Sequence, residues 1–228
     1  MRDSVARVAV FDVDGTLTAT NAVDDECFQR AISEVFALEL PRVPYANVQH
    51  VTDSFISRYL CEQYRGSVPS DAELAKSIER FVALLGDAHA APPARFAPIR
   101  GAPGLFDDLR GAGWDVAIAT GGWEPPARFK LSVAGIELGD APLACAGDAI
   151  SRAAIVRLAI ERSAALSRRA ADPVVRVGDR PWDVRTATEV GVAFVGVGQG
   201  SREEALRSAG ASVVLPDLAD RPLLLEAL

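Results

Sequence analysis

The sequence predicts an α/β fold, in which a doubly wound parallel sheet carries an inserted helical region. Three apolar segments, at residues 8–11, 116–119 and 174–177, each run into small or polar residues. Strand-like and helix-like segments alternate beyond about residue 99, which is typical of a parallel sheet with helices on both faces. Residues 21–99 carry apolar side chains at helical spacing instead. These observations together favour an α/β core interrupted by a helical insertion.

The first predicted strand ends in Asp12-Val13-Asp14-Gly15-Thr16. Because residues two apart on a strand point the same way, Asp12 can act as a nucleophile and Asp14 as a proton donor. Asp-Gly between alternating residues is also a β-hairpin signal, and the segment alone does not decide between the two. The carboxyl ends of parallel strands share one edge, so the polar residues that follow all three strands are predicted to meet in one site.

The helical insertion contains one particularly clear element. Ser70 and Glu73 form a predicted capping box, apolar residues follow at helical spacing, and Gly86 is expected to end the helix. The prolines of segment 90–94 indicate a hinge between insertion and core. The predicted organisation is a core of residues 1–20 and 98–228, with a helical domain of residues 21–97.

The second half of the chain supplies the rest of the predicted core. Its helices begin near Leu105, at Pro125, at Arg152 and at Trp182, and its strands cover residues 116–119, 143–146, 174–177, 192–197 and 212–215. Ser201 and Glu204 form a second predicted capping box. We therefore interpret the glycines of segment 196–200 as a loop, because G-x-G-x-x-G dinucleotide spacing is missing.

Composition limits the classes of partner. With 228 residues, of which 49% are hydrophobic, the chain can bury a sizeable core. Its net charge of −7 argues against nucleic acid as a general partner. No segment reaches the roughly 18 uninterrupted apolar residues of a membrane span, and the N-terminus has no signal-peptide pattern, so we expect a cytoplasmic protein with no membrane partner. We interpret Cys27, Cys61 and Cys145 as reduced, buried residues.

The motifs and their order resemble the haloacid dehalogenase superfamily, in the branch that includes phosphoglycolate phosphatases and β-phosphoglucomutases. Three motifs carry the resemblance: Asp12-x-Asp14-x-Thr16, then Thr120 with Gly121, and finally Gly178-Asp179 with Asp183. The resemblance implies a Rossmann-like core with an inserted helical cap domain that closes over the site.

The resemblance also implies a Mg²⁺ site. Asp12, the backbone carbonyl of Asp14 and Asp179 would hold the metal, with Asp183 as a further ligand or a supporting residue. Carboxylates brought within about 4 Å repel each other by several kcal/mol at an effective dielectric near 20, and a bound cation removes that conflict. The alternative for Asp183 is a solvated acid in the first turn of a helix.

The family's third motif is usually a lysine shortly before the fourth motif, and this chain has none there. Arg152 is nearest to the expected place, and an arginine can bind phosphate in a bidentate manner. We expect Arg152 to bind the transferring phosphoryl oxygens together with Thr120 and the amide of Gly121. The alternatives are that Arg152 is solvated surface, or that Lys130 takes this role.

The predicted cap contributes a polar segment at residues 49–53. His50 is either a substrate-specificity residue or plain surface, whereas Thr52 or Asp53 is predicted to cap the helix that follows. His89, near the predicted hinge, is interpreted as structural.

The predicted activity is that of a phosphoric monoester hydrolase acting on a small phosphorylated metabolite. Asp12 would attack the phosphoryl group to give an aspartyl-phosphate, while Asp14 protonates the leaving oxygen and later takes a proton from water. Dehalogenases and phosphonatases of the superfamily lack an Asp at position 14, so Asp14 favours phosphate ester chemistry. The alternatives are a β-phosphoglucomutase-like phosphotransferase and a non-enzymatic phospho-acceptor or binding module.

Overall fold

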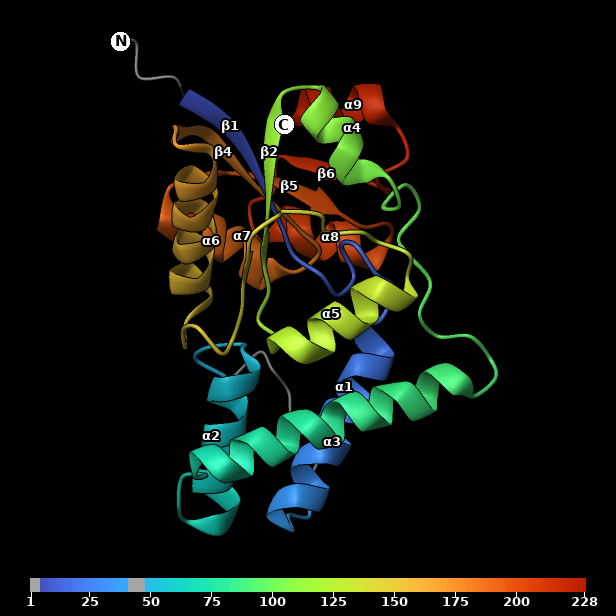
Figure 1. The fold of residues 1–228 in the computed structure, drawn as a ribbon, viewed down its shortest axis with the longest axis vertical. Helices are drawn as coiled ribbons and strands as arrows, with labels where there is room; N and C mark the ends of the chain where they lie inside the picture. Colours follow the sequence, from blue (N-terminus) through green and yellow to red (C-terminus); the bar gives the residue numbers. More distant parts are fainter. Residues whose placement is uncertain (1–4, 41–47) are drawn as a thin grey trace.

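The computed structural model describes residues 5–40 and 48–228. Within these residues six parallel strands form one sheet, in the order β3-β2-β1-β4-β5-β6 (Figure 1). The strands are β1 (Val5–Phe11), β2 (Trp114–Ala119), β3 (Leu143–Ala144), β4 (Ala170–Gly178), β5 (Ala193–Val197) and β6 (Val213–Leu215). The predicted α/β fold is confirmed, and because β1 pairs in parallel with both β2 and β4, the hairpin alternative is wrong.

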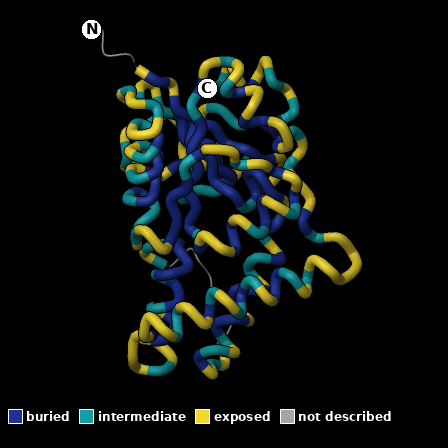
Figure 2. Tube along the Cα trace, in the orientation of Figure 1, coloured by how far each residue is buried: buried dark blue, intermediate teal, exposed yellow. Residues whose placement is uncertain are grey.

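Helices cover both faces of this sheet. On one face lie α6 (Arg152–Ser167), α7 (Pro181–Val190) and α8 (Ser201–Ser208), and on the other lie α4 (Leu105–Gly111), α5 (Glu124–Val133) and α9 (Arg221–Ala227). In β1, Val8 and Val10 pack toward α6, whereas Ala9 and Phe11 pack toward α4 and α5. All four side chains are completely buried, as expected for a central parallel strand. Figure 2 shows the buried centre of the sheet.

Three further helices lie beyond the carboxyl ends of the strands (Figure 1). They are α1 (Asn21–Phe36), α2 (Asp53–Arg65) and α3 (Asp71–Ala90). Apolar side chains such as Phe28, Leu60 and Phe81 form a cluster between them, and this cluster reaches Trp123 next to the sheet. A helical layer thus stands over the edge of the sheet where the motif residues emerge. The domain boundaries at residues 20/21 and 97/98 stay a prediction.

The predicted helix ends are confirmed only in part. The capping box at Ser70 is present, because its hydroxyl accepts from the Glu73 amide at 3.3 Å and the Glu73 carboxylate accepts from the Ser70 amide at 2.8 Å. Gly86 does not end α3, which continues to Ala90 because a single glycine is tolerated inside a packed helix. The capping box predicted at Ser201 is also wrong. Gly200 takes the N-cap position, which makes Ser201 the first helical residue.

The helices of the described ranges include none that is long and apolar enough to cross a membrane. All three cysteines are free and buried, as their interpretation from the sequence requires.

Candidate active site

The first and fourth motifs meet where β1 and β4 end. Asp12 follows β1, and its amide donates to the Val177 carbonyl of β4 at 3.0 Å. Asp179 follows β4 directly. The loop after Asp14 passes so close that a Cβ on Gly15 would lie 2.0 Å from Asp179 Oδ2, and the backbone of Gly15 has a φ of +81°. Only glycine fits there, which explains the Asp-x-Asp-Gly order.

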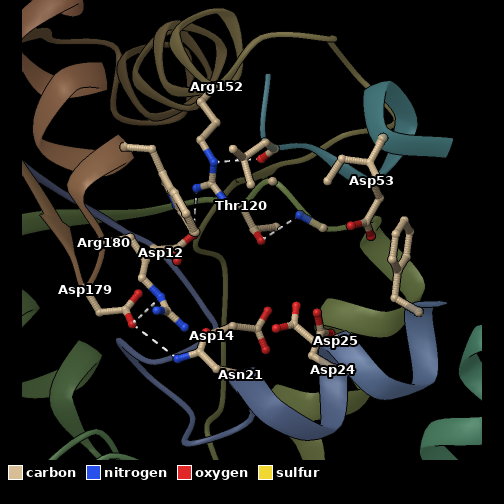
Figure 3. Close-up of a pocket in the computed structure, with 16 residues that line it drawn as sticks. Asp12, Asp14, Asn21, Asp24, Asp25, Asp53, Thr120, Arg152, Asp179 and Arg180 are labelled. Carbon is tan, nitrogen blue, oxygen red and sulfur yellow. Dashed lines mark hydrogen bonds and ion pairs between the residues drawn. The ribbon is translucent and has the colours of Figure 1, made fainter. Parts of the chain in front are cut away.

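A cavity of about 140 Å³ opens at this edge of the sheet (Figure 3). Its lining includes six of the predicted site residues: Asp12, Asp14, Thr120, Gly121, Arg152 and Asp179. Residues from α1 and α2 complete the wall, so the helical layer forms one side of the cavity. The cavity lies beside β1, where the order of the strands reverses, and open parallel sheets bind ligands at such points.

Three buried carboxylates crowd one end of the cavity. One oxygen each of Asp12, Asp179 and Asp183 lies within 4.8 Å of the others. Burial, followed by the charge of Asp183, raises the pKa of Asp12 to about 6, and burial with the charge of Asp12 raises the pKa of Asp179 to about 8. Asp12 Oδ1 and Asp179 Oδ1 are buried and have no hydrogen-bond partner in the described chain. A divalent cation fits this all-oxygen donor set and would satisfy both atoms.

Arg152 lies beside the predicted nucleophile. Its Nη1 is 3.6 Å from Asp12 Oδ1 and 3.2 Å from Asp183 Oδ1, and its Nε donates to the Val51 carbonyl at 2.8 Å. A Cβ on Gly121 would lie 2.6 Å from the backbone carbonyl oxygen of Val51 and 2.6 Å from Arg152 Nη2, and because the backbone oxygen cannot easily move, the second motif must have glycine at that position. The side chain of Arg152 is only 15% exposed, which excludes the interpretation as solvated surface.

A second arginine at this end was not predicted from the sequence. Arg176 is fully buried on β4, and its Nη2 lies 3.3 Å from Asp12 Oδ1 and 2.9 Å from Asp183 Oδ1. Its Nη1 donates to the Ala119 carbonyl at 2.9 Å. Asp183 is therefore a completely buried partner of two arginines, and its interpretation as a solvated helix acid is wrong. One feature of the sequence could have indicated this buried arginine: it is a charged residue inside the apolar run of residues 174–177, where it needs a buried partner.

Asp14 forms an ion pair with a buried lysine. Lys130 donates to Asp14 Oδ2 at 2.6 Å and also contacts Asp24 of α1, while the Thr20 hydroxyl donates to Asp14 Oδ1 at 2.6 Å. Burial and the charge of Asp14 raise the pKa of Asp24 well above its usual range. Lys130 therefore contacts the predicted proton donor, whereas the cations beside Asp12 are Arg152 and Arg176.

The start of α2 touches the second motif. The Asp53 amide donates to the Gly121 carbonyl, and the Asp53 carboxylate accepts from the Trp123 amide at 2.9 Å. The Thr52 hydroxyl donates to the Ile150 carbonyl at 2.8 Å, and neither residue's side chain caps α2. Thr52 therefore takes the N-cap position of α2, as predicted, but its side chain does not cap the helix, because both side chains have partners outside it. Asp53 lines the cavity instead, and burial raises its pKa to about 7.

The two histidines lie away from the carboxylates. His50 packs edge-on against Phe55 with ring centroids 5.1 Å apart, and it does not line the cavity that contains Asp12. His89 contacts the rings of Phe96 and Phe129, which matches its structural interpretation. A role of His50 in substrate binding has no support from this arrangement.

Residues 6–191 match the family model of haloacid dehalogenase-like hydrolases. No curated protein sequence matches the chain.

Solved structures resemble the whole chain. A hydrolase from Pseudomonas syringae is 18% identical, with a TM-score of 0.71 over 96% of this chain and 98% of that one. CbbY from Rhodobacter sphaeroides in complex with phosphate is 22% identical, with a TM-score of 0.66 over 95% and 96%. A predicted phosphoglycolate phosphatase from Haemophilus somnus is 17% identical, with a TM-score of 0.64 over 96% and 98%. At these identities the likeness shows the fold.

Proposed function

Because this chain belongs to the haloacid dehalogenase-like hydrolases, we propose that it is a Mg²⁺-dependent phosphatase of a small phosphorylated metabolite. One observation carries the proposal. Asp12 and Asp179 each have a buried carboxylate oxygen without a hydrogen bond beside the same cavity, and the Asp12 oxygen lies within ion-pair distance of Arg152 and Arg176. Such a site offers a nucleophile, a place for a cation and a positive group for phosphoryl oxygens. The phosphate in the similar structure of CbbY is consistent with this chemistry.

The cation would be held by Asp12, Asp179 and the backbone carbonyl of Asp14. When bound, Mg²⁺ would neutralise the crowded carboxylates and polarise the phosphoryl oxygens. Asp183 has its oxygens engaged by Arg152, Arg176 and the Arg180 amide, so we assign it a supporting role.

In the first half-reaction, a carboxylate oxygen of Asp12 attacks phosphorus and the bond from phosphorus to the leaving oxygen breaks. Asp14, when protonated, gives its proton to that oxygen, and the leaving group departs as a neutral alcohol. Arg152 balances the negative charge of the phosphoryl oxygens, with Thr120 and the Gly121 amide as further donors. The product of this step is an aspartyl-phosphate on Asp12.

In the second half-reaction, water attacks the phosphorus of the aspartyl-phosphate and Asp14 accepts the proton of that water. The bond between phosphorus and the Asp12 oxygen breaks, which restores the carboxylate and releases inorganic phosphate. Lys130 donates to Asp14 Oδ2 at 2.6 Å and so helps to orient the carboxyl group for this step.

Hydrolysis of 4-nitrophenyl phosphate tests the proposal. We expect wild-type turnover in MgCl₂ that is lost on chelation of the metal, and a loss of roughly 1000-fold or more in Asp12→Asn, because the amide cannot act as the nucleophile. Asp87→Asn, an equal charge change on α3 away from the cavity, should leave turnover unchanged. Wild-type turnover in Asp12→Asn would reject the nucleophile assignment. Transfer of phosphate within a sugar phosphate, without release, would favour the phosphotransferase alternative.

A further inference from the structure

The two carboxylate oxygens of Asp179 have different surroundings. Asn21 Nδ2 donates a hydrogen bond to Oδ2 at 3.2 Å (Figure 3), and Arg180 Nε and Arg202 Nη1 lie 3.3 and 3.4 Å from the same oxygen. The other oxygen, Oδ1, is buried and has no hydrogen-bond partner among the described residues. All three neighbouring groups thus engage Oδ2, and Oδ1 is left free for a cation.

We propose that Asn21 is a positioning residue for the cation site, because its hydrogen bond to Asp179 Oδ2 orients Asp179 Oδ1 toward the cation. This inference rests on the proposed function, since it concerns the cation of the same site. It adds that cation binding depends on a residue of the helical layer, because Asn21 is the first residue of α1.

The backbone of the first motif leaves room for this hydrogen bond. A Cβ on Gly15 would lie 2.2 Å from Asn21 Nδ2 and 2.0 Å from Asp179 Oδ2. Both atoms of the hydrogen bond therefore occupy the space that a side chain at position 15 would fill. Any residue other than glycine would displace one of the two atoms, so the contact between Asn21 and Asp179 depends on Gly15.

The start of α1 fixes the position of Asn21. Thr20 is the N-cap residue, and its hydroxyl donates to Asp14 Oδ1 at 2.6 Å. The Asp24 amide donates to the Thr20 carbonyl at 2.8 Å, which closes the first turn of the helix. These contacts place the backbone of Asn21 without any help from Asp179. Asn21 can therefore restrain the Asp179 side chain, and does not simply follow it.

Asn21 differs from the two arginines because its side chain is neutral. Arg180 and Arg202 attract the carboxylate of Asp179 but repel a divalent cation, so their contributions to cation binding oppose each other. The Asn21 amide orients the carboxylate without that repulsion. Groups that form hydrogen bonds to the ligands of a metal typically contribute roughly 10- to 100-fold to its affinity. Asn21 is therefore the residue at which orientation can be measured separately from charge.

Calorimetric titration of the metal-free protein with MgCl₂ tests the inference. In Asn21→Ala we expect the dissociation constant of Mg²⁺ to rise by roughly tenfold or more. Asn21→Leu should give the same rise, because leucine has nearly the shape of asparagine but no donor. Agreement between the two variants excludes an effect of lost volume, and either one decides the test if the other does not fold.

The matched control is Gln29→Ala, which removes an amide from the same helix at a position that does not line the cavity. This variant should bind Mg²⁺ with wild-type affinity. Wild-type affinity in the Asn21 variants, or an equal loss of affinity in Gln29→Ala, would overturn the inference.

The Mg²⁺ dependence of turnover gives a second readout. If Asn21 acts through Asp179, the Mg²⁺ concentration that gives half-maximal hydrolysis of 4-nitrophenyl phosphate should rise in Asn21→Ala by about the same factor as the dissociation constant. Excess MgCl₂ should then recover most of the turnover. A loss of turnover that excess MgCl₂ does not recover would contradict a role through the cation, because a damaged fold loses turnover at every Mg²⁺ concentration.

The two proposals can fail separately. If the wild type is a Mg²⁺-dependent phosphatase and the Asn21 variants bind Mg²⁺ as it does, the proposed function stands and this inference falls. If the wild type binds Mg²⁺ but cleaves no phosphate ester, the proposed function falls and the calorimetric titrations still decide the inference. If the wild type binds no Mg²⁺, both proposals fall.

Discussion

Lys130 Nζ donates to Asp14 Oδ2 over 2.6 Å from a completely buried position on α5. The same ammonium group contacts Asp24, which lies on the first helix of the helical layer. Burial opposes the charge of Lys130, but Asp14 and Asp24 outweigh it and raise the pKa of the ammonium group above its ordinary value. One buried cation thus contacts both the proton donor of the proposed mechanism and a helix that lines the cavity.

Removing this cation should destabilise the protein. In Lys130→Met the long stem remains, but two largely buried carboxylates lose their shared counter-ion. We expect the free energy of unfolding to fall by about 3–5 kcal/mol, which is typical when one partner of a buried ion pair is removed. Urea unfolding near pH 7 measures the change. We also expect kcat to fall, because Asp14 loses one of the two groups that orient it.

The double variant Lys130→Met with Asp24→Asn is the matched control. It removes one of the two uncompensated charges, so it should recover part of the lost stability relative to Lys130→Met alone. A single Lys130→Met variant with wild-type stability would show that Asp14 and Asp24 do not depend on this counter-ion.

The two arginines near Asp12 should give different kinetic effects. Arg152 lines the cavity, so Arg152→Ala should both raise KM and lower kcat for 4-nitrophenyl phosphate. Arg176 does not line the cavity and acts through Asp12 and Asp183, so Arg176→Met should lower kcat and stability with little effect on KM. Steady-state kinetics and urea unfolding of the purified variants measure this. A larger rise of KM in Arg176→Met than in Arg152→Ala would reverse the assignment.

Much of the site could be predicted because its chemistry lies at strand ends. Asp12, Thr120 and Asp179 each follow an apolar run, and parallel strands share a carboxyl edge, so the order of the segments is enough to bring the three residues together. Arg152, by contrast, could be placed only because the motifs resemble those of the family.

The contacts that sequence reasoning missed join distant segments. Lys130 and Asp14 are 116 residues apart, and no periodicity in the sequence pairs them. Asp53 stands where a helix-capping acid is common, but the packing of α2 against the Trp123 loop gives its carboxylate another partner. Arg176 lies inside an apolar strand, so its burial depends on Asp183 of the following helix and on Asp12, which follows the neighbouring strand.

Cation binding should release protons. In the folded protein without cation, Asp179 has a pKa of about 8 and Asp12 of about 6, and both carboxylates must be ionised to hold Mg²⁺. At pH 7 we therefore expect about one proton released per cation, and an affinity that rises as the pH is raised from about 6 to about 8. Calorimetric titration in buffers with different heats of ionisation measures the number of protons. Binding with no proton release at pH 7 would contradict the carboxylate site.

The free energy of unfolding should depend on pH through Asp53, and an Asp53→Asn variant tests this dependence. Burial raises its pKa in the folded protein to about 7 from an ordinary value of 3.8, so the fold favours the neutral acid. The resulting stabilisation is fully present below about pH 4 and is lost as the pH rises through 7. Asp53→Asn is neutral at every pH, so without ligand it should exceed the wild type by roughly 2–4 kcal/mol at pH 8 and by much less at pH 5. Urea unfolding of both proteins at the two pH values measures this, and a difference that does not change with pH would show that the charge of Asp53 is already compensated in the folded protein.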